Sequence, residues 1–160
     1  MNAEAQRLIA ALGLEPHPEG GYFKQTYRSS TTVQGSQGLR RAATSIYYLL
    51  EGDDFSSFHR LQSDEIWHHY RGAAVAIEII EPTGKHVQLM IGEDDRLQAA
   101  ILAGSWFAAH LCGEGAYALV GCDVAPGFEY EDFEIGTQEA LVTTFPHHRS
   151  LIERWTRARQ

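Results

Sequence analysis

The chain has 160 residues, a formal net charge of −8, 44% hydrophobic residues and 21% charged residues. These values are typical of one globular domain over residues 1–160, and they exclude a disordered chain, a collagen and a coiled coil. No apolar run approaches the roughly 20 residues of a membrane-spanning helix, and the first residues do not form a secretory signal, so we expect a cytoplasmic protein that does not bind membranes.

Basic residues are scarce and unevenly distributed. The chain contains 13 Lys and Arg and 21 Asp and Glu, and none of the 13 basic residues lies between Arg96 and Arg149. Because nucleic-acid binding depends on well-placed cations, this charge pattern excludes a nucleic-acid partner. The two cysteines, Cys112 and Cys122, form no C-x-x-C motif and are expected to pack as small apolar side chains in a reducing compartment.

The N-terminal segment predicts a helix followed by a turn. Asn2 is a favourable N-cap and Gly13 a favourable terminator. The apolar residues that share one face of this helix are Ala5, Leu8, Ile9 and Leu12. Further on, Glu19-Gly20-Gly21 predicts a tight turn with Tyr22 opening a strand, and two interpretations of this segment stay open: a plain turn, or a turn that also lines a pocket.

The middle of the chain predicts short strands that are rich in β-branched and aromatic residues. These segments are 43–50, 56–61, 65–70, 74–80, 86–91, 97–102, 106–111, 117–124 and 140–145. Gly, Asp or Pro separates most of them, which favours an all-β sandwich or barrel. The run that follows Pro126 is interpreted as a solvated loop or a dimer contact. A capping-box pattern at Ser150–Glu153 predicts a short C-terminal helix through Trp155.

The window 59–72 holds the richest set of polar side chains. Side chains alternate along a strand, so Ser57 and His59 share one face, and Glu65, Trp67 and His69 share a face of the next strand. If both faces point inward, His59 and Glu65 approach each other. A His and a carboxylate in that position would bind a metal or act as an acid–base pair.

This window resembles the first motif of the cupin superfamily. His59, Glu65 and Gly72 match its His, Glu and Gly at the motif's spacing, and 101–107 is similar to the second motif. Segments 12–29, 45–72 and 121–136 resemble a family of small single-domain cupins of unassigned function. The resemblance implies a double-stranded β-helix, the cupin jelly-roll barrel, with short helices at both termini, and it implies a homodimer.

The sequence departs from the metal-binding version of these motifs. Leu61 and Phe107 stand where such a cupin would carry His, and Leu102 replaces the usual Pro. One His and one Glu are too few for zinc or a facial-triad iron, although His69 would supply a third ligand by strand parity. We therefore expect no tightly bound cofactor, with a weak divalent metal at His59 and Glu65 left open.

The expected site is a mostly apolar small-molecule pocket. We expect His59 and Glu65 to be its catalytic pair. The ligand-binding residues expected around them are Ser57, Trp67, His69, Phe107, Tyr47 and Trp106. Core packing stays open for Trp67 and Trp106, while His17 and His110 are interpreted as structural and His68 as a surface residue.

Three functions follow from this pocket. The first is a metal-independent isomerase, epimerase or lyase acting on a small polar or sugar-like metabolite. In it His59 is the acid–base group and Glu65 its orienting residue or a second acid, an arrangement similar to that of the sugar-nucleotide epimerases. The second is ligand binding without chemistry, and the third is a structural or storage-like barrel.

Overall fold

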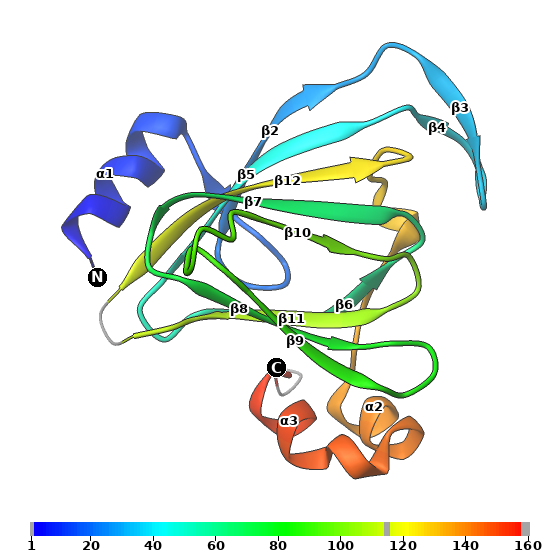
Figure 1. Ribbon diagram of the computed structural model, residues 1–160. Helices are drawn as coiled ribbons and strands as arrows, with labels where there is room; N and C mark the ends of the chain where they lie inside the picture. Colours follow the sequence, from blue (N-terminus) through cyan, green and yellow to red (C-terminus); the bar gives the residue numbers. More distant parts are fainter. Residues whose placement is uncertain (1, 114–115, 158–160) are drawn as a thin grey trace.

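The computed structural model describes residues 2–113 and 116–157, and its strands form two facing antiparallel sheets with a projecting ribbon (Figure 1). The first sheet contains, in spatial order, β1 (Glu15–Pro16), β2 (Tyr22–Arg28), β5 (Thr44–Glu51), β12 (Tyr117–Ala125), β7 (Asp64–Gly72) and β10 (Gln98–Ile101). The second contains β13 (Phe133–Ile135), β6 (Phe55–Leu61), β11 (Trp106–Leu111), β8 (Val75–Ile80) and β9 (His86–Ile91). The ribbon pairs β3 (Thr32–Gly35) with β4 (Gly38–Arg41). The all-β jelly-roll prediction is thereby confirmed, and eight of the expected strands are present with ends that differ from the prediction by at most two residues.

The main apolar core lies between the two sheets. Alternation along each strand turns one set of side chains inward. Tyr48 and Trp67 come from the first sheet, Ile77 and Phe107 come from the second, and all four are at most 1% exposed. This core fixes which face of β6 and β7 points inward.

Helix α1 (Ala3–Leu12) covers the outer face of the first sheet. The Asn2 side chain accepts hydrogen bonds from two backbone N–H groups of the first turn, and Gly13 ends the helix at φ 63°. The apolar face, including Leu8, packs on Leu49 and Leu119. The predicted helix, its cap and its terminator are confirmed.

The segment 140–145, predicted as a strand, is helical instead. Helix α2 (Gln138–Thr144) is capped by Thr137, whose hydroxyl accepts from the Ala140 N–H at 3.3 Å. Leu141 and Val142 lie on one buried face of this helix. Burial of that face outweighs the strand preference of its β-branched residues, because tertiary packing overrides a weak local propensity.

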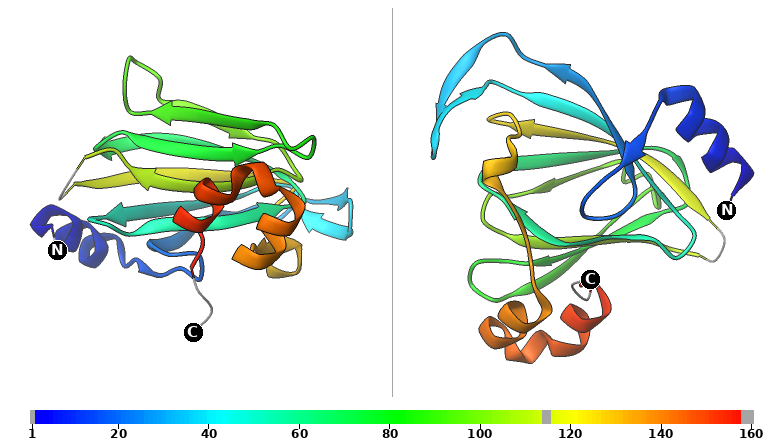
Figure 2. Two further views of the ribbon diagram at one scale, coloured as in Figure 1. Left: turned by 90° about the horizontal axis from the view of Figure 1, so that it is seen from below. Right: turned by 180° about the vertical axis from the view of Figure 1, so that it is seen from behind.

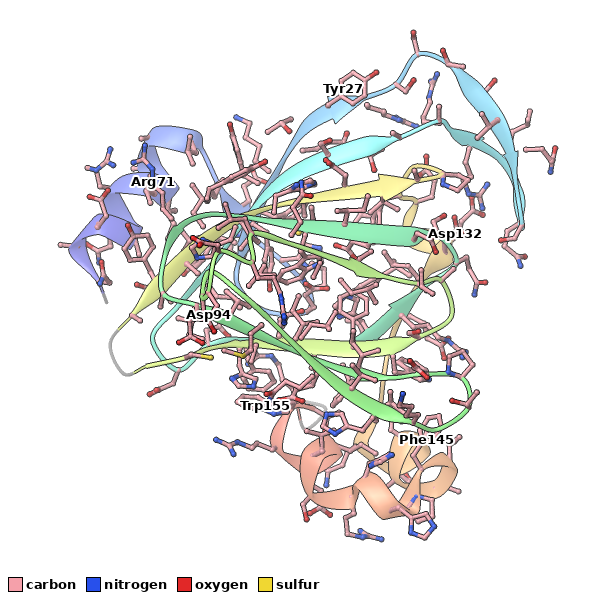
Figure 3. The ribbon with its side chains drawn as sticks, viewed as in Figure 1. Tyr27, Arg71, Asp94, Asp132, Phe145 and Trp155 are labelled. Atoms are coloured by element: carbon pink, nitrogen blue, oxygen red, sulfur yellow. The ribbon has the colours of Figure 1, made fainter. Side chains whose placement is uncertain are left out.

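The C-terminal helix is also capped differently from the prediction. A 3-10 turn η2 (Pro146–His148) leads into α3 (Arg149–Arg154), so Ser150 lies inside the helix and makes no cap. Together α2 and α3 cover the outer face of the five-stranded sheet (Figure 2). Trp155 lies between α3 and that sheet, and its ring stacks on His110 with centroids 4.0 Å apart (Figure 3).

In the part of the chain that the structure describes, no helix combines the length and the apolar character needed to cross a bilayer.

Candidate functional site

A cavity of about 240 Å³ lies between the sheets, at the end of the barrel from which the β3–β4 ribbon projects. Strands β2, β5, β6, β7, β12 and β13 form its walls, and the segments around Glu19 and from Phe128 to Tyr130 complete it. The lining residues are His17, Glu19, Phe23, Gln25, Thr44, Ile46, Tyr48, His59, Leu61, Glu65, Cys122, Val124, Phe128, Tyr130 and Phe133. The cavity is therefore mostly apolar, with a few acidic and imidazole groups.

His59 presents one ring nitrogen to this cavity's polar end. Its Nδ1 lies 2.8 Å from the carbonyl oxygen of Ser57, and because a carbonyl only accepts, Nδ1 carries a proton and donates it. The other nitrogen, Nε2, lies 3.1 Å from Oε2 of Glu19. The backbone of β6 thus fixes the tautomer and directs Nε2 toward a carboxyl group.

Glu19 reaches His59 from a turn that only glycine permits. Gly20 and Gly21 have φ of 113° and 69°, and a Cβ at Gly20 would lie 2.1 Å from the Phe55 carbonyl oxygen. The carbonyl of Glu19 accepts from the Ser57 N–H at 2.8 Å, which holds the turn against β6. The predicted tight turn is confirmed.

Burial sets the protonation of this pair. Burial lowers the pKa of His59 to about 4 and raises the pKa of Glu19. Both directions favour the uncharged forms, and in the uncharged pair the carboxyl group of Glu19 donates its proton to His59 Nε2. The other oxygen, Oε1, accepts from the Ser56 hydroxyl at 2.8 Å.

His17 closes the other side of Glu19. Its Nδ1 accepts from the Glu19 N–H at 3.2 Å and lies 3.7 Å from Oε2. An Nδ1 that accepts is unprotonated, in agreement with burial, which lowers the pKa of this imidazole. His17 is thus a neutral wall of the site.

Glu65 is the second carboxyl group of the cavity. It lies near the start of β7, is 7% exposed, and its Oε2 makes no hydrogen bond within the described residues. Burial, together with the nearby Glu19, raises the pKa of Glu65 to about 8, and the adjacent Trp67 and Cys122 offset only part of that shift. A buried, unpaired carboxyl oxygen is costly and is satisfied when a ligand supplies a partner.

The structure separates the predicted site residues into three groups. His59 and Glu65 line the cavity. Phe107 and Trp67 pack behind it, with the Phe107 ring centroid 4.0 Å from that of His59 and the Trp67 ring 5.6 Å from that of Tyr48. Neither Phe107 nor Trp67 lines the cavity.

The other predicted ligand contacts lie elsewhere. Ser57 donates its hydroxyl to the Trp155 carbonyl, and His69 donates Nε2–H to the Ala73 carbonyl. Tyr47 packs on the outer face beneath α1, and Trp106 packs beneath the C-terminal helices.

Several lining residues were not assigned to the site from the sequence. His17 was interpreted as structural, and Phe128, Tyr130 and Phe133 belong to the run interpreted as a loop. The available signal was the density of aromatic residues after Pro126, which exceeds that of a purely solvated loop. Tyr48, rather than Tyr47, faces inward and donates its hydroxyl to the Gly20 carbonyl at 2.7 Å.

An ion pair holds the mouth of the cavity to the ribbon. Tyr130 and Asp132 belong to the 3-10 turn η1 (Tyr130–Asp132), and both oxygens of Asp132 accept from the Arg40 guanidinium of β4, at 2.7 and 2.8 Å. Asp132 lies at the ribbon end of the barrel (Figure 3). Arg40 and Asp132 are both buried.

The donor set does not fit a resident zinc or facial-triad iron. Leu61 lines the cavity where a metal-binding cupin would carry a His, and the Phe107 ring packs on His59. Among the described residues, no three His, Cys, Asp or Glu side chains are arranged to hold a metal ion. Weak metal binding at His59 and Glu65 stays a prediction.

Comparison with known proteins decides the family. The family model described as "Cupin superfamily (DUF985)" matches residues 6–136. The chain belongs to the cupin superfamily. This cupin is 31% identical to the Saccharomyces cerevisiae "Uncharacterized protein YML079W" over 79% of its own chain and 72% of the yeast protein.

Two solved structures share the fold of this cupin over nearly its whole length. A hypothetical protein from Leishmania major is 32% identical, with a TM-score of 0.91 over 99% of this chain and 100% of the other. Protein SO0799 from Shewanella oneidensis is 36% identical, with a TM-score of 0.89 over 99% of each chain. The names of these relatives assign no activity, so any function must be argued from the site.

Proposed function

We propose that this cupin binds a small molecule in the cavity between its sheets and exchanges protons with it, as a metal-independent isomerase, epimerase or lyase. The observation that carries the proposal is the 3.1 Å contact between His59 Nε2 and Glu19 Oε2, at the buried end of the cavity. His59 and Glu19 are only 2% and 6% exposed. One proton lies between two acceptors in a nearly dry site, where proton transfer to a bound ligand is efficient.

Glu65 supplies a second group that exchanges protons. Its pKa of about 8 leaves it mostly protonated at neutral pH, with an ionised fraction that is a stronger base than an ordinary carboxylate. The ionised form removes a proton from one position of the ligand, and the His59–Glu19 pair delivers its proton to another. Exchange with solvent restores both groups. Isomerases, epimerases and lyases that act by proton transfer can use such a donor and acceptor on one ligand.

Deuterium labelling tests this proposal across many candidate substrates at once. The protein is incubated with the small-molecule fraction of a cell extract in D2O, and mass spectrometry finds compounds that gain deuterium or newly appear. We expect labelling or conversion by the wild type, a loss of about 10²–10⁴-fold in His59→Gln, and no loss in His147→Gln, whose imidazole is exposed. Equal labelling by His59→Gln would contradict the assignment.

Ligand binding without chemistry is the second candidate. The apolar walls of the cavity favour it, since a pocket lined by Phe23, Phe128 and Phe133 binds a ligand whether or not a proton moves. This candidate predicts that an extract compound raises the melting temperature equally for the wild type and His59→Gln, while neither protein labels that compound.

A further inference from the structure

The charge of the cavity wall restricts what it can bind, and the following inference rests on the proposed function. Among the described residues that line the cavity, none is Lys or Arg, whereas Glu19 and Glu65 both contribute carboxyl groups. An anionic ligand would lose its hydration and gain no opposite charge. The wall therefore disfavours phosphates, carboxylates and sugar nucleotides.

The two carboxyl groups also act on each other. When Glu19 is ionised, its charge disfavours ionisation of Glu65, which adds to the effect of burial. Glu65 Oε2 is buried, belongs to a cavity-lining side chain and forms no hydrogen bond within the described residues. A cation placed next to this oxygen would relieve the repulsion and provide the missing partner.

Aromatic rings form part of the cavity wall. The rings of Phe128, Tyr130 and Phe133 lie 5.1 to 6.2 Å apart, centroid to centroid, and Phe23 lines the same cavity. Aromatic faces attract organic cations, and their edges and faces pack on an apolar body. Carboxyl groups and aromatic rings in one cavity match a molecule with a charged head and an apolar remainder.

We infer that the cavity selects a small organic ammonium ion, with the ammonium group against Glu65 and an apolar or aromatic body among Phe23, Phe128 and Phe133. The volume of about 240 Å³ accommodates a single ring with a short side chain. Glu65 then has a binding role in addition to its role in proton exchange.

Three probes that differ only in the head group test this inference. Benzylammonium, benzyl alcohol and benzoate share a ring and differ in charge. Thermal shift at about 10 mM and calorimetric titration at pH 7 give the stabilisation and Kd of each. We expect benzylammonium to raise Tm and to bind about tenfold or more tightly than benzyl alcohol, and benzoate to cause no shift.

The variant Glu65→Gln keeps the shape of the side chain and removes its ability to become negatively charged beside a bound ammonium group. We expect it to lose the preference for benzylammonium over benzyl alcohol by about tenfold or more, and to keep its affinity for the alcohol. Glu15→Gln, which changes an exposed carboxylate of β1, is the matched control and should bind as the wild type does.

Three results would overturn the inference. They are equal or tighter wild-type binding of the alcohol or benzoate, an ammonium preference that survives in Glu65→Gln, and no binding of any probe. Because none of these measurements uses labelling, they leave the proton-exchange proposal to its own test. Conversely, ammonium preference without any deuterium labelling would support the ligand class and contradict catalysis.

Discussion

His59 and Glu19 lie in distant segments of the chain, yet Nε2 of one is 3.1 Å from Oε2 of the other. The imidazole is held by the Ser57 carbonyl and the carboxyl group by the Ser56 hydroxyl, so adjacent residues of β6 orient both partners. This second layer of hydrogen bonds keeps the pair in place before any ligand arrives, which is what a proton-exchanging site requires.

Glu19→Gln tests whether the carboxyl proton matters. The amide keeps the size of the side chain and can donate an N–H to His59 Nε2, so the contact persists while the transferable proton is lost. We expect deuterium labelling of the substrate to fall about 10²–10⁴-fold with little change in Tm. Glu15→Gln is the surface control.

The opposite result would reassign the chemistry. If Glu19→Gln labels substrate at the wild-type rate while His59→Gln does not, His59 exchanges the proton by itself and Glu19 only positions the ring.

The sequence predicted the inward faces of two strands but not the partner from the N-terminal turn. Alternation over β6 and β7 is enough to place His59 and Glu65 on faces that point inward, because their apolar neighbours show the parity. The position of Glu19 depends on a chain reversal at two glycines, and no local sequence pattern shows which strand that turn packs against. Its contact with His59 arises from tertiary packing and could not be predicted from the sequence.

The sequence does not show which face of a strand points inward where both faces carry similar residues. Tyr47 and Tyr48 are adjacent and aromatic, so the sequence alone does not show which one faces the cavity. In the structure Tyr47 lies on the outer face, where it packs against the cluster under α1. A different ambiguity explains the wrong strand prediction at 140–145, because a short apolar run fits the periodicity of a helix as well as that of a strand.

Stability should fall as the pH rises above 6.5, because of Glu65. The pKa of Glu65 is raised from 4.5 to about 8, so between these values the native state binds more protons than the unfolded state, and stability decreases with pH. The pKa of His59 is lowered from 6.5 to about 4, which gives the opposite slope between those values. Above pH 6.5 the contribution of His59 fades, so Glu65 sets most of the pH dependence of stability that these two groups cause.

Chemical denaturation at several pH values measures this effect. We expect the ionisation of Glu65 to lower the free energy of unfolding of the wild type by about 1.5 kcal/mol between pH 6.5 and 8. Glu19, whose pKa is also raised, acts in the same direction, so the informative quantity is the difference from Glu65→Gln. Identical slopes for the two proteins would show that Glu65 ionises normally.

Breaking the pair between Arg40 and Asp132 should loosen the mouth of the cavity. Arg40→Gln removes the guanidinium group that donates to both carboxylate oxygens, and it leaves Asp132 buried without this partner. We expect chymotrypsin to cut after the exposed Tyr130 about threefold faster or more, and benzylammonium to bind more weakly. Arg7→Gln, which breaks an exposed pair with Glu4, is the control. Unchanged cleavage in Arg40→Gln would mean that packing of the aromatic residues alone holds η1.

The two cysteines should differ sharply in reactivity. Burial raises the pKa of both thiols, but Cys122 is 2% exposed and its pKa lies well above the ordinary value, whereas Cys112 is half-buried. Since the thiolate is the reactive form, we expect iodoacetamide to alkylate Cys112 about 100-fold faster or more in the native protein and both at similar rates in denaturant. Peptide mass spectrometry measures the two rates, and Cys112→Ser isolates Cys122.

The rate at Cys122 also reports on the cavity, because this side chain lines its wall. If Cys122 is alkylated only through cavity opening, then a ligand that fills the cavity lowers its rate and leaves that of Cys112 unchanged. Benzylammonium should therefore protect Cys122 in the wild type and protect it less in Glu65→Gln. Native alkylation of Cys122 as fast as that of Cys112 would instead show that the reagent enters the cavity freely, and the nearly dry environment argued for His59 and Glu19 would then not hold.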